Sequence, residues 1–242
     1  MIDAHAHLQD EAFKKDLKEV LIRARLVGVE AIINAAVDFD DSVKCLEISR
    51  EYDLIYPVIG LAPYSKLSQI KAVMQLIEGS PDVVGIGEIG LDWPYQKNEA
   101  QMVPFKKQTE LADELDIPVV IHSRSAGKYC INTLIEMKAK KVLMHAYDGS
   151  IKDARRAWEN GFYFSIPLTV LVNPEKQKLA KEIPDEFLML ETDSPVLNPT
   201  KERNEPANLQ KSRDFIAELR GVKPKKIEKL STDNAKRLFS LK

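Results

Sequence analysis

The chain has few cysteines, no long apolar run and almost no net charge, and each scarcity excludes a class of protein. Its two cysteines, Cys45 and Cys130, fall in segments typical of helices. A disulfide framework is therefore not expected, and a reducing cytoplasm is the expected compartment. No apolar stretch approaches the ~20 residues needed to cross a bilayer. The first residues do not show a basic segment followed by an apolar one, so no signal peptide is expected.

Net positive charge is also missing. The formal net charge is −2 over 242 residues, so there is no overall basic field to hold duplex DNA by its phosphates. Any recognition of phosphate must then be local. The composition, 44% hydrophobic and 30% charged, is typical of a globular protein with a substantial core. Because no repeat, low-complexity tract or linker interrupts the chain, we expect a single domain over 1–242.

Short apolar segments alternate regularly with longer amphipathic ones. The apolar segments are MIDAHAH, VEAIINAAV, LIYPVIGLAP, VVGIGEIG, PVVIHSR, KVLMHA, GFYFSI and FLMLETD. Helices are expected after them at about 10–27, 41–52, 66–79, 98–116, 126–139, 150–160, 174–183 and 205–219, with a last one over 223–240. This alternation predicts a parallel (β/α)₈ TIM barrel. A doubly wound open sheet is the alternative, although no G-x-G-x-x-G element follows the first strand.

The four histidines all fall at the carboxyl ends of predicted strands, where a barrel places its active site. His5 and His7 are two residues apart, so both side chains face the same way in a strand. His122 and His145 end the fifth and sixth predicted strands. A lone buried histidine is usually structural, but four at one rim favour metal binding.

Carboxylates occur at the same rim. Glu88 in GIGEIG and Asp193 in LMLETDSP each follow an apolar run, where an unpaired charge is costly and a cation would offset the cost. Asp193 is preferred to Glu191 because it lies nearer the strand end, and Asp3, deeper in its strand, is expected to be structural. The resulting set of His, Glu and Asp ligands exceeds the four of a structural zinc site. It predicts two divalent ions, Mg²⁺, Mn²⁺ or Zn²⁺.

Such a pair of ions suits hydrolysis. Metals ~3.5–4 Å apart clamp both the attacking and the leaving oxygen of a displacement, and they lower the pKa of water to about 7. Glu88 is the expected bridging ligand. Asp193 is expected to bind metal, to accept the proton of the attacking water, or to do both in turn.

Several blocks of sequence resemble the signatures of the TatD-related deoxyribonucleases. They are GEIGLDW, IHSRSA, ETDSP, RNEPANL and STDNAKRLF, in this order over nearly the whole chain. The resemblance implies a TIM barrel of the amidohydrolase-like group that hydrolyses phosphodiester bonds of DNA, often from the 3′ end, with a divalent metal. It assigns the family's metal and catalytic positions to His5, His7, Glu88, His122, His145 and Asp193.

Substrate contacts are expected from the same blocks. The fork of Arg124, in the H-x-R-x-A block, suits a phosphate, with a rim salt bridge as the alternative. Trp93 is expected either to stack on a terminal base or to cover the barrel rim. Arg203, Asn204 and Glu205 follow the eighth predicted strand, where they contact substrate or cap the next helix.

Two positions depart from the family pattern. The family's G-x-H-P block reads GLAP, with Ala62 in place of the histidine, and its H-C-F-S/T-G block reads HAYDG. Tyr147 keeps an aromatic ring as a candidate substrate contact, whereas Asp148 adds negative charge near the expected phosphate. Neither change removes a metal ligand, so both bear on the identity of the substrate.

The sequence therefore predicts a cytoplasmic, metal-dependent 3′–5′ exonuclease acting on single-stranded or frayed DNA ends, because a barrel mouth admits a chain end more readily than a duplex. We expect a monomer without membrane contact. The first alternative is a metal-dependent hydrolase of a small ester, lactone or amide. The second is an inactive barrel that binds metal or a partner.

Overall fold

The strands follow one another around a ring in the order in which they occur in the chain. The computed structural model describes residues 1–95 and 99–241. In these two segments, eight parallel strands pair in the order β1-β2-β3-β4-β5-β6-β7-β8. Their bounds are β1 Ile2–Ala6, β2 Ala31–Ala35, β3 Ile55–Ile59, β4 Gly85–Gly90, β5 Val119–His122, β6 Val142–Met144, β7 Tyr163–Ile166 and β8 Leu188–Leu190.

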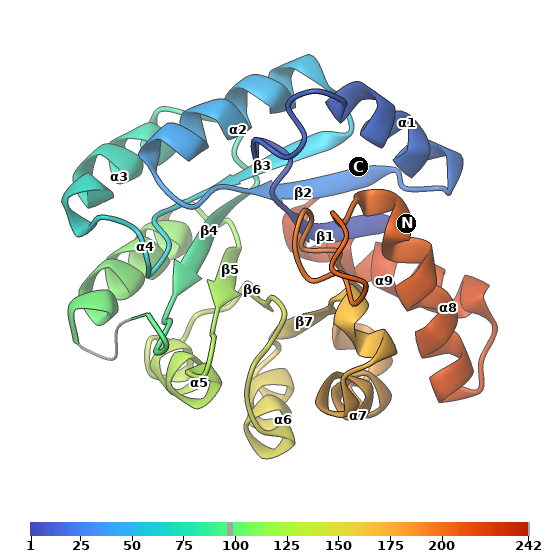
Figure 1. Ribbon diagram of the computed structural model, residues 1–242. Helices are drawn as coiled ribbons and strands as arrows, with labels where there is room; N and C mark the ends of the chain where they lie inside the picture. Colours follow the sequence, from blue (N-terminus) through green and yellow to red (C-terminus); the bar gives the residue numbers. More distant parts are fainter. Residues whose placement is uncertain (96–98, 242) are drawn as a thin grey trace.

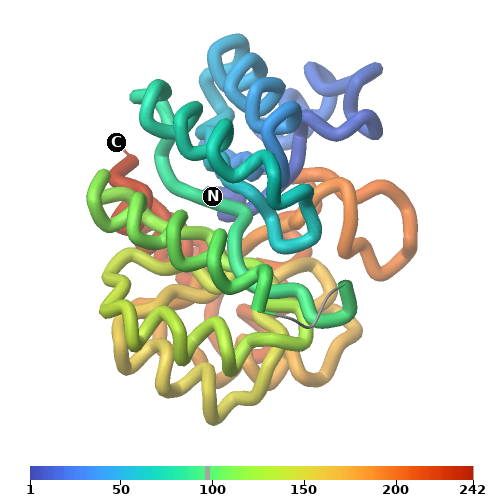
Figure 2. The backbone as a smooth tube through the Cα atoms, turned by 90° about the vertical axis from the view of Figure 1, so that its left-hand side faces the viewer, coloured from blue at the N-terminus to red at the C-terminus, as the bar shows by residue number. Residues whose placement is uncertain are grey.

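Helices surround this ring on the outside (Figure 1), and neighbouring helices lie side by side along its wall (Figure 2). They are α1 Leu17–Leu26, α2 Phe39–Glu51, α3 Ile70–Glu78, α4 Met102–Glu114, α5 Gly127–Glu136, α6 Ile151–Glu159, α7 Pro174–Glu182, α8 Leu209–Arg220 and α9 Pro224–Phe239. Short 3-10 helices are η1 Leu67–Gln69, η2 Glu99–Gln101, η3 Leu168–Leu171, η4 Asp185–Phe187 and η5 Pro206–Asn208. The predicted TIM barrel is confirmed. Among the described residues, no helix is long and apolar enough to span a bilayer.

The barrel closes where the segment after β8 meets β1. Ala6 and Ser194 form a parallel bridge, and the backbone N–H of His7 donates to the Ser194 carbonyl at 2.7 Å. The Asp193 N–H donates to the His5 carbonyl at 2.9 Å. These bonds join the first and last strands, so they also place two predicted ligands of β1 beside one that follows β8.

Two apolar layers fill the structure. The larger lies between the strands and the surrounding helices, and it includes Ile32, Ile59, Ile86 and Ile121. The smaller lies inside the ring and combines Ile2, Ala4, Ala31, Ile33, Val58, Val120, Leu143 and Met189 with Ala235, Leu238 and Phe239 of α9. Helix α9 therefore covers the amino-terminal end of the barrel, and the carboxyl-terminal end is left for the polar residues.

Strand β4 departs from the regular two-residue period just before its polar residue. Ile86 pairs with Val119 and Ile89 pairs with Ile121, so three residues of β4 span two of β5. Both isoleucines pack in the layer under the helices. In a regular strand Glu88 would face the same way as Ile86, but the irregularity turns it into the barrel mouth, as bulges next to active sites do.

Strand β1 has the same irregularity. Asp3 pairs with Ile32 and Ala6 pairs with Asn34, again three residues against two. Asp3 therefore does not share a face with the two histidines that follow it. Its fully buried carboxylate accepts hydrogen bonds from the Thr192 backbone at 2.9 Å and from the Thr192 hydroxyl at 2.6 Å, which ties β1 to β8. Burial raises the pKa of Asp3 to about 8.

The first helix is shorter than its pattern predicts. A helix was expected from about residue 10, but α1 begins at Leu17 and hydrogen-bonded turns precede it. The Asp10 carboxylate accepts a backbone N–H two residues on, which competes with helix formation. The Asp16 carboxylate is bound by the Arg203 guanidinium from the far end of the chain. The other predicted helices match more closely, although residue 98, where one was expected to begin, lies outside the described residues.

A substitution at Gly90 tests how closely the backbone of β4 approaches that of β5. Its φ is +135°, and a Cβ there would lie 2.1 Å from the His122 carbonyl oxygen, whereas Gly28, with a φ of +86°, has open space around it. Backbone strain alone costs about 1–3 kcal/mol. We expect Gly28→Ala to stay in that range and Gly90→Ala to cost more than about 3 kcal/mol, because it adds a clash. Urea unfolding of both variants measures this, and equal losses would contradict it.

Candidate metal centre

Six side chains from five strands or the segments directly after them meet in the barrel mouth. They are the predicted ligands His5, His7, Glu88, His122, His145 and Asp193. Two subsets bring one possible ligand atom from each residue within 4.8 Å of the others, namely His5 with Glu88 and His145, and His5 with His7 and Asp193. The structure thus brings together all the candidate ligands that the sequence singled out.

One oxygen of Glu88 faces the β1 histidines. Glu88 Oε2 lies 3.4 Å from both His5 Nε2 and His7 Nε2, and these two nitrogens are 3.1 Å apart. Asp193 Oδ1 completes the group at 3.6 Å from His5 Nε2 and 3.3 Å from His7 Nε2. Two ring nitrogens and two carboxylate oxygens therefore converge on one small volume, as ligands of a divalent cation do.

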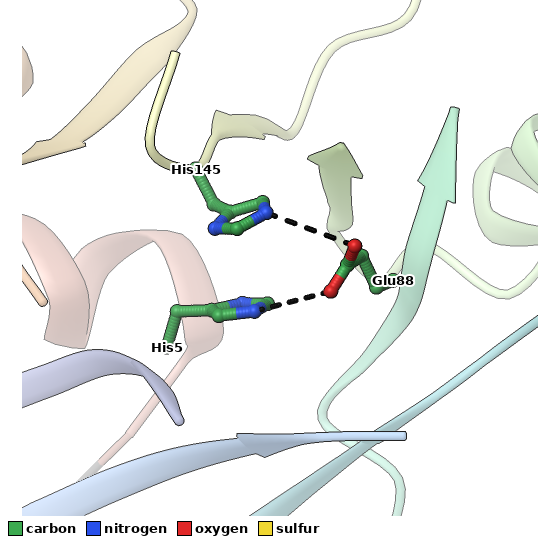
Figure 3. A group of neighbouring side chains, drawn as sticks. All are labelled: His5, Glu88 and His145. Atoms are coloured by element: carbon green, nitrogen blue, oxygen red, sulfur yellow. Dashed lines mark ion pairs between the residues drawn. The ribbon is translucent and has the colours of Figure 1, made fainter. Parts of the chain in front are cut away.

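The other oxygen of Glu88 faces the opposite side of the mouth. Glu88 Oε1 lies 2.5 Å from His122 Nδ1 and 3.9 Å from His145 Nε2. Figure 3 shows the carboxylate between His5 and His145, with one oxygen directed to each ring. The Tyr64 hydroxyl also donates to Oε1 at 3.2 Å. Glu88 therefore connects two groups of potential ligands.

The charges in this cluster need positive partners. Glu88 is 2% exposed, and burial alone would raise its pKa, but the imidazoles of His122, His5 and His7 hold that pKa well below its usual range. In the same way, burial would lower the pKa of His122, yet Glu88 and Asp92 raise it to about 9. Glu88 and Asp92 thus favour the charged form of His122, which is the response of a site that attracts cations.

Hydrogen bonds to the second ring nitrogen orient the imidazoles of His7 and His122. His7 Nδ1 is 2.7 Å from the Ala35 carbonyl oxygen, and His122 Nε2 is 2.9 Å from Asp92 Oδ2. Each bond turns the other ring nitrogen toward Glu88, which is how metal-binding histidines are usually held. The nearest carboxylate to His145 Nδ1 is that of Glu191, at 3.6 Å.

Unsatisfied buried atoms give an independent test of the donor set. Among the described residues, His5 Nδ1 and His145 Nδ1 are buried without a hydrogen-bond partner. Burial lowers the pKa of both imidazoles, so both favour the neutral form that binds metal. Neutral imidazoles beside ionised, desolvated carboxylates are the chemistry of a divalent-cation site, and the residues present fit such ions.

The cluster forms the floor of a pocket of about 860 Å³. Besides the ligands, the pocket is lined by Tyr64, Asp92 and Lys176, which sequence reasoning did not assign to the site. Tyr64 follows the GLAP block, so its position after β3 was the available signal. Lys176 lies on α7, a helix whose sequence resembles an ordinary solvated face, and nothing in that pattern distinguishes it from Lys178.

Arg124 lines the pocket, but its guanidinium is already paired with the Asp92 carboxylate. Its Nε lies 3.1 Å from Asp92 Oδ1 and its Nη2 lies 2.8 Å from Asp92 Oδ2. Trp93 is not among the lining residues of this pocket and packs instead against the Tyr129 ring, with centroids 4.0 Å apart. Tyr147 is buried and donates its hydroxyl to the Ser150 carbonyl.

The three polar residues after β8 hold the polypeptide chain in place. Arg203 binds the Asp16 carboxylate with both terminal nitrogens, and Glu205 is bound by Arg23, with 2.7 Å between Arg23 Nη2 and Glu205 Oε2. Asn204 is fully buried, and its amide nitrogen donates to backbone carbonyls. Contact of residues 203–205, Trp93 or Tyr147 with substrate remains a prediction.

The chain is similar to known proteins over nearly its whole length. The model of the family described as TatD related DNase matches residues 2–240. Human deoxyribonuclease TATDN3 is 36% identical over 259 residues, which cover 99% of this chain and 94% of the human protein. The 3'-5' ssDNA/RNA exonuclease TatD of Salmonella typhimurium is 29% identical, covering 100% and 99%. The crystal structure of YJJV, a TatD homologue of Escherichia coli K12, has a TM-score of 0.92 at 26% identity, covering 100% and 98%.

Asn204 links the stability of the fold to the position of Asp193. Its Nδ2 donates to the Thr192 carbonyl at 2.7 Å and to the Val196 carbonyl at 3.0 Å, on either side of the ligand. We expect Asn204→Ala to lower the free energy of unfolding by about 2–4 kcal/mol, because buried carbonyls lose their donors. Metal affinity should also fall.

The matched control is Asn198→Ala, since Asn198 lies in the same loop and its side chain bonds only exposed groups of Thr200. Denaturant unfolding and calorimetric titration with Mn²⁺ measure the two effects. Equal affinity for Mn²⁺ in both variants would contradict the role given to Asn204.

Proposed function

The chain belongs to the TatD-related DNase family, and we propose that it is a 3′–5′ exonuclease acting on single-stranded or frayed ends of DNA. The observation that carries the proposal is the position of Glu88, whose two carboxylate oxygens face two separate groups of ligands. That arrangement supports a bridging role between two divalent ions, with His5, His7 and Asp193 on one side and His122 and His145 on the other.

The chain's own residues have distinct roles in this proposal. Bound divalent ions would stabilise negative charge on phosphoryl oxygens and lower the pKa of water. Asp193 presents Oδ1 to the β1 histidines, which leaves Oδ2 to accept the proton of the attacking water. Tyr64 holds Glu88 in position through its hydroxyl. Burial and the carboxylates around it raise the pKa of Tyr64, so the hydroxyl keeps its proton.

A chain end is the substrate that suits this pocket. The pocket lies at the carboxyl ends of the strands, and a barrel mouth admits a chain end more readily than a continuous duplex. With a net charge of −2, the protein has little to hold a continuous duplex. The Salmonella relative is named an exonuclease of single-stranded DNA and RNA, and the human relative a deoxyribonuclease, which supports a nucleic-acid end as substrate.

All six proposed ligands come from one chain, which supports a monomer as the working unit. The two cysteines, Cys45 and Cys130, are free and buried, and burial raises the pKa of each thiol to about 12. They fit a reducing cytoplasm, which we propose as the compartment.

A small ester, lactone or amide is the second candidate substrate. Asp148 favours it, because its carboxylate lines the pocket and would repel a phosphate. That charge is partly engaged, since Asp148 Oδ2 accepts the Ser125 backbone N–H at 2.7 Å. An inactive barrel is less well supported, because a complete set of six ionisable side chains gathered at a buried site is costly to keep without a use.

Stepwise shortening of a 5′-labelled single-stranded oligonucleotide with Mg²⁺ or Mn²⁺ tests the exonuclease. We expect shortening that stops with chelator and with Glu88→Ala, because both remove the bridging arrangement. Asp193→Asn should lower kcat by about 10²–10⁴-fold through loss of the proton acceptor. Glu186→Gln, at an exposed position of η4, is the matched control and should leave kcat unchanged.

The outcome separates the candidates. A metal-loaded protein that shortens no oligonucleotide but hydrolyses a panel of esters and lactones would replace the nuclease by the second candidate. A metal-loaded protein inactive on both would favour the barrel that only binds metal or a partner.

A further inference from the structure

Among the described residues, Arg124 and Lys176 are the basic side chains other than histidine that line the pocket, and they are bonded in different ways. Arg124 is paired with the Asp92 carboxylate through two nitrogens. Lys176 lies in the first turn of α7. In the described part of the chain, no carboxylate oxygen lies within 4.0 Å of its Nζ. Its Nζ donates instead to the carbonyl oxygens of Ala146, at 2.8 Å, and Tyr147.

These two bonds leave donor capacity in the pocket. An ammonium has three N–H donors, and two of those of Lys176 are used by neutral carbonyls. The ammonium is anchored to the loop that directly follows His145, so it lies beside the candidate metal centre. Burial lowers the pKa of Lys176, and the nearby carboxylates of Glu191, Asp148 and Asp193 act in the opposite direction. A bound anion would further stabilise the charged form.

A second observation points to a polar ligand in the same pocket. Ser123, directly after β5, is 3% exposed and lines the pocket, and its buried hydroxyl has no hydrogen-bond partner among the described residues. Asn173, which caps α7 through its side-chain oxygen, lines the pocket as well. The lining of the pocket therefore holds further polar side chains besides Lys176, and a buried hydroxyl without a partner is costly unless a ligand satisfies it.

We propose that Lys176 is a substrate-binding residue whose ammonium binds a non-bridging oxygen of a phosphate held against the metal centre. The proposal deepens the proposed function, since it names the group that recognises the substrate phosphate, and it rests on that function only for the identity of the rest of the substrate. Lys176 supplies the local positive charge that the chain's net charge does not, and it offsets the repulsion expected from Asp148.

Binding of inorganic phosphate to the metal-loaded protein tests this without turnover. Loss of a charge-assisted hydrogen bond weakens binding by about tenfold or more. We expect Lys176→Met to raise the Kd of phosphate, measured by calorimetry, by that factor. Lys176→Arg should keep most of the affinity. Lys178→Met, an exposed lysine on the same helix, is the matched control and should have no effect.

Lys176 could affect phosphate binding directly, or indirectly by holding the loop after His145 in place. The metal content per chain, measured on each variant, distinguishes these two roles. Normal metal content with weakened phosphate binding is the expected result. Unchanged phosphate affinity in Lys176→Met would overturn the proposal, and so would loss of metal in that variant, because the lysine would then act on the loop. Lys176→Cys treated with 2-bromoethylamine restores an ammonium and should restore affinity, since both native cysteines are buried.

The same variants distinguish this proposal from the exonuclease itself. If the wild-type protein shortens DNA, Lys176→Met should raise KM for the oligonucleotide more than it lowers kcat. If the wild type shortens no DNA but phosphate binding still depends on Lys176, the proposed nuclease fails while the phosphate site stands. If DNA is shortened and phosphate binding ignores Lys176, the nuclease stands and this proposal fails.

Discussion

Closure of the barrel between β1 and the segment after β8 is the constraint on which both the fold and the site depend. The bonds from His7 to Ser194 and from Asp193 to His5 complete the ring of strands. They also bring ligands together that are almost the whole chain apart in sequence. The closing contact involves backbone groups, so it does not depend on the ligands' own chemistry. A change that weakens this closure, such as loss of the Asp3 contact with Thr192, would lower the free energy of unfolding and also displace the ligands of the candidate metal centre.

The second constraint is the cost of placing charge at the end of an apolar barrel. Irregular pairing in β4 turns Glu88 inward while Ile86 and Ile89 stay in the apolar layer under the helices. In a regular strand Glu88 would share a face with Ile86, and Ile89 would lie on the other face, so the irregularity is what lets both isoleucines pack together while the carboxylate faces the barrel mouth. The imidazoles around Glu88 then stabilise its charge. The strand deformation therefore has a functional reason, because it produces a buried carboxylate open to ligands on both of its oxygens.

Much of this was readable from the sequence, and the exceptions have physical causes. The alternation of apolar and amphipathic segments predicted the barrel. The four histidines at the ends of predicted strands predicted where its active-site rim lies. Both patterns can be read within single segments of the sequence. The irregular strands were not predicted, since GIGEIG reads as a regular strand whichever way Glu88 points. The start of α1 was missed because Asp10 and Asp16 prefer side-chain bonds to helix formation. Tyr64, Asp92 and Lys176 were missed because their roles depend on distant neighbours rather than on their own segments.

The two departures from the family pattern, Ala62 and Asp148, both lie near other polar side chains of the site. Ala62 removes an imidazole from the loop after β3, yet that loop still contacts the site through the Tyr64 hydroxyl on Glu88. A hydroxyl adds a donor without adding charge. Asp148 adds negative charge to the pocket, where the Ser125 backbone N–H donates to its carboxylate and the Lys176 ammonium of α7 donates to carbonyls of the loop that contains it. Each lost or reversed group therefore has a neighbour of different but usable chemistry, which supports the proposed phosphate site.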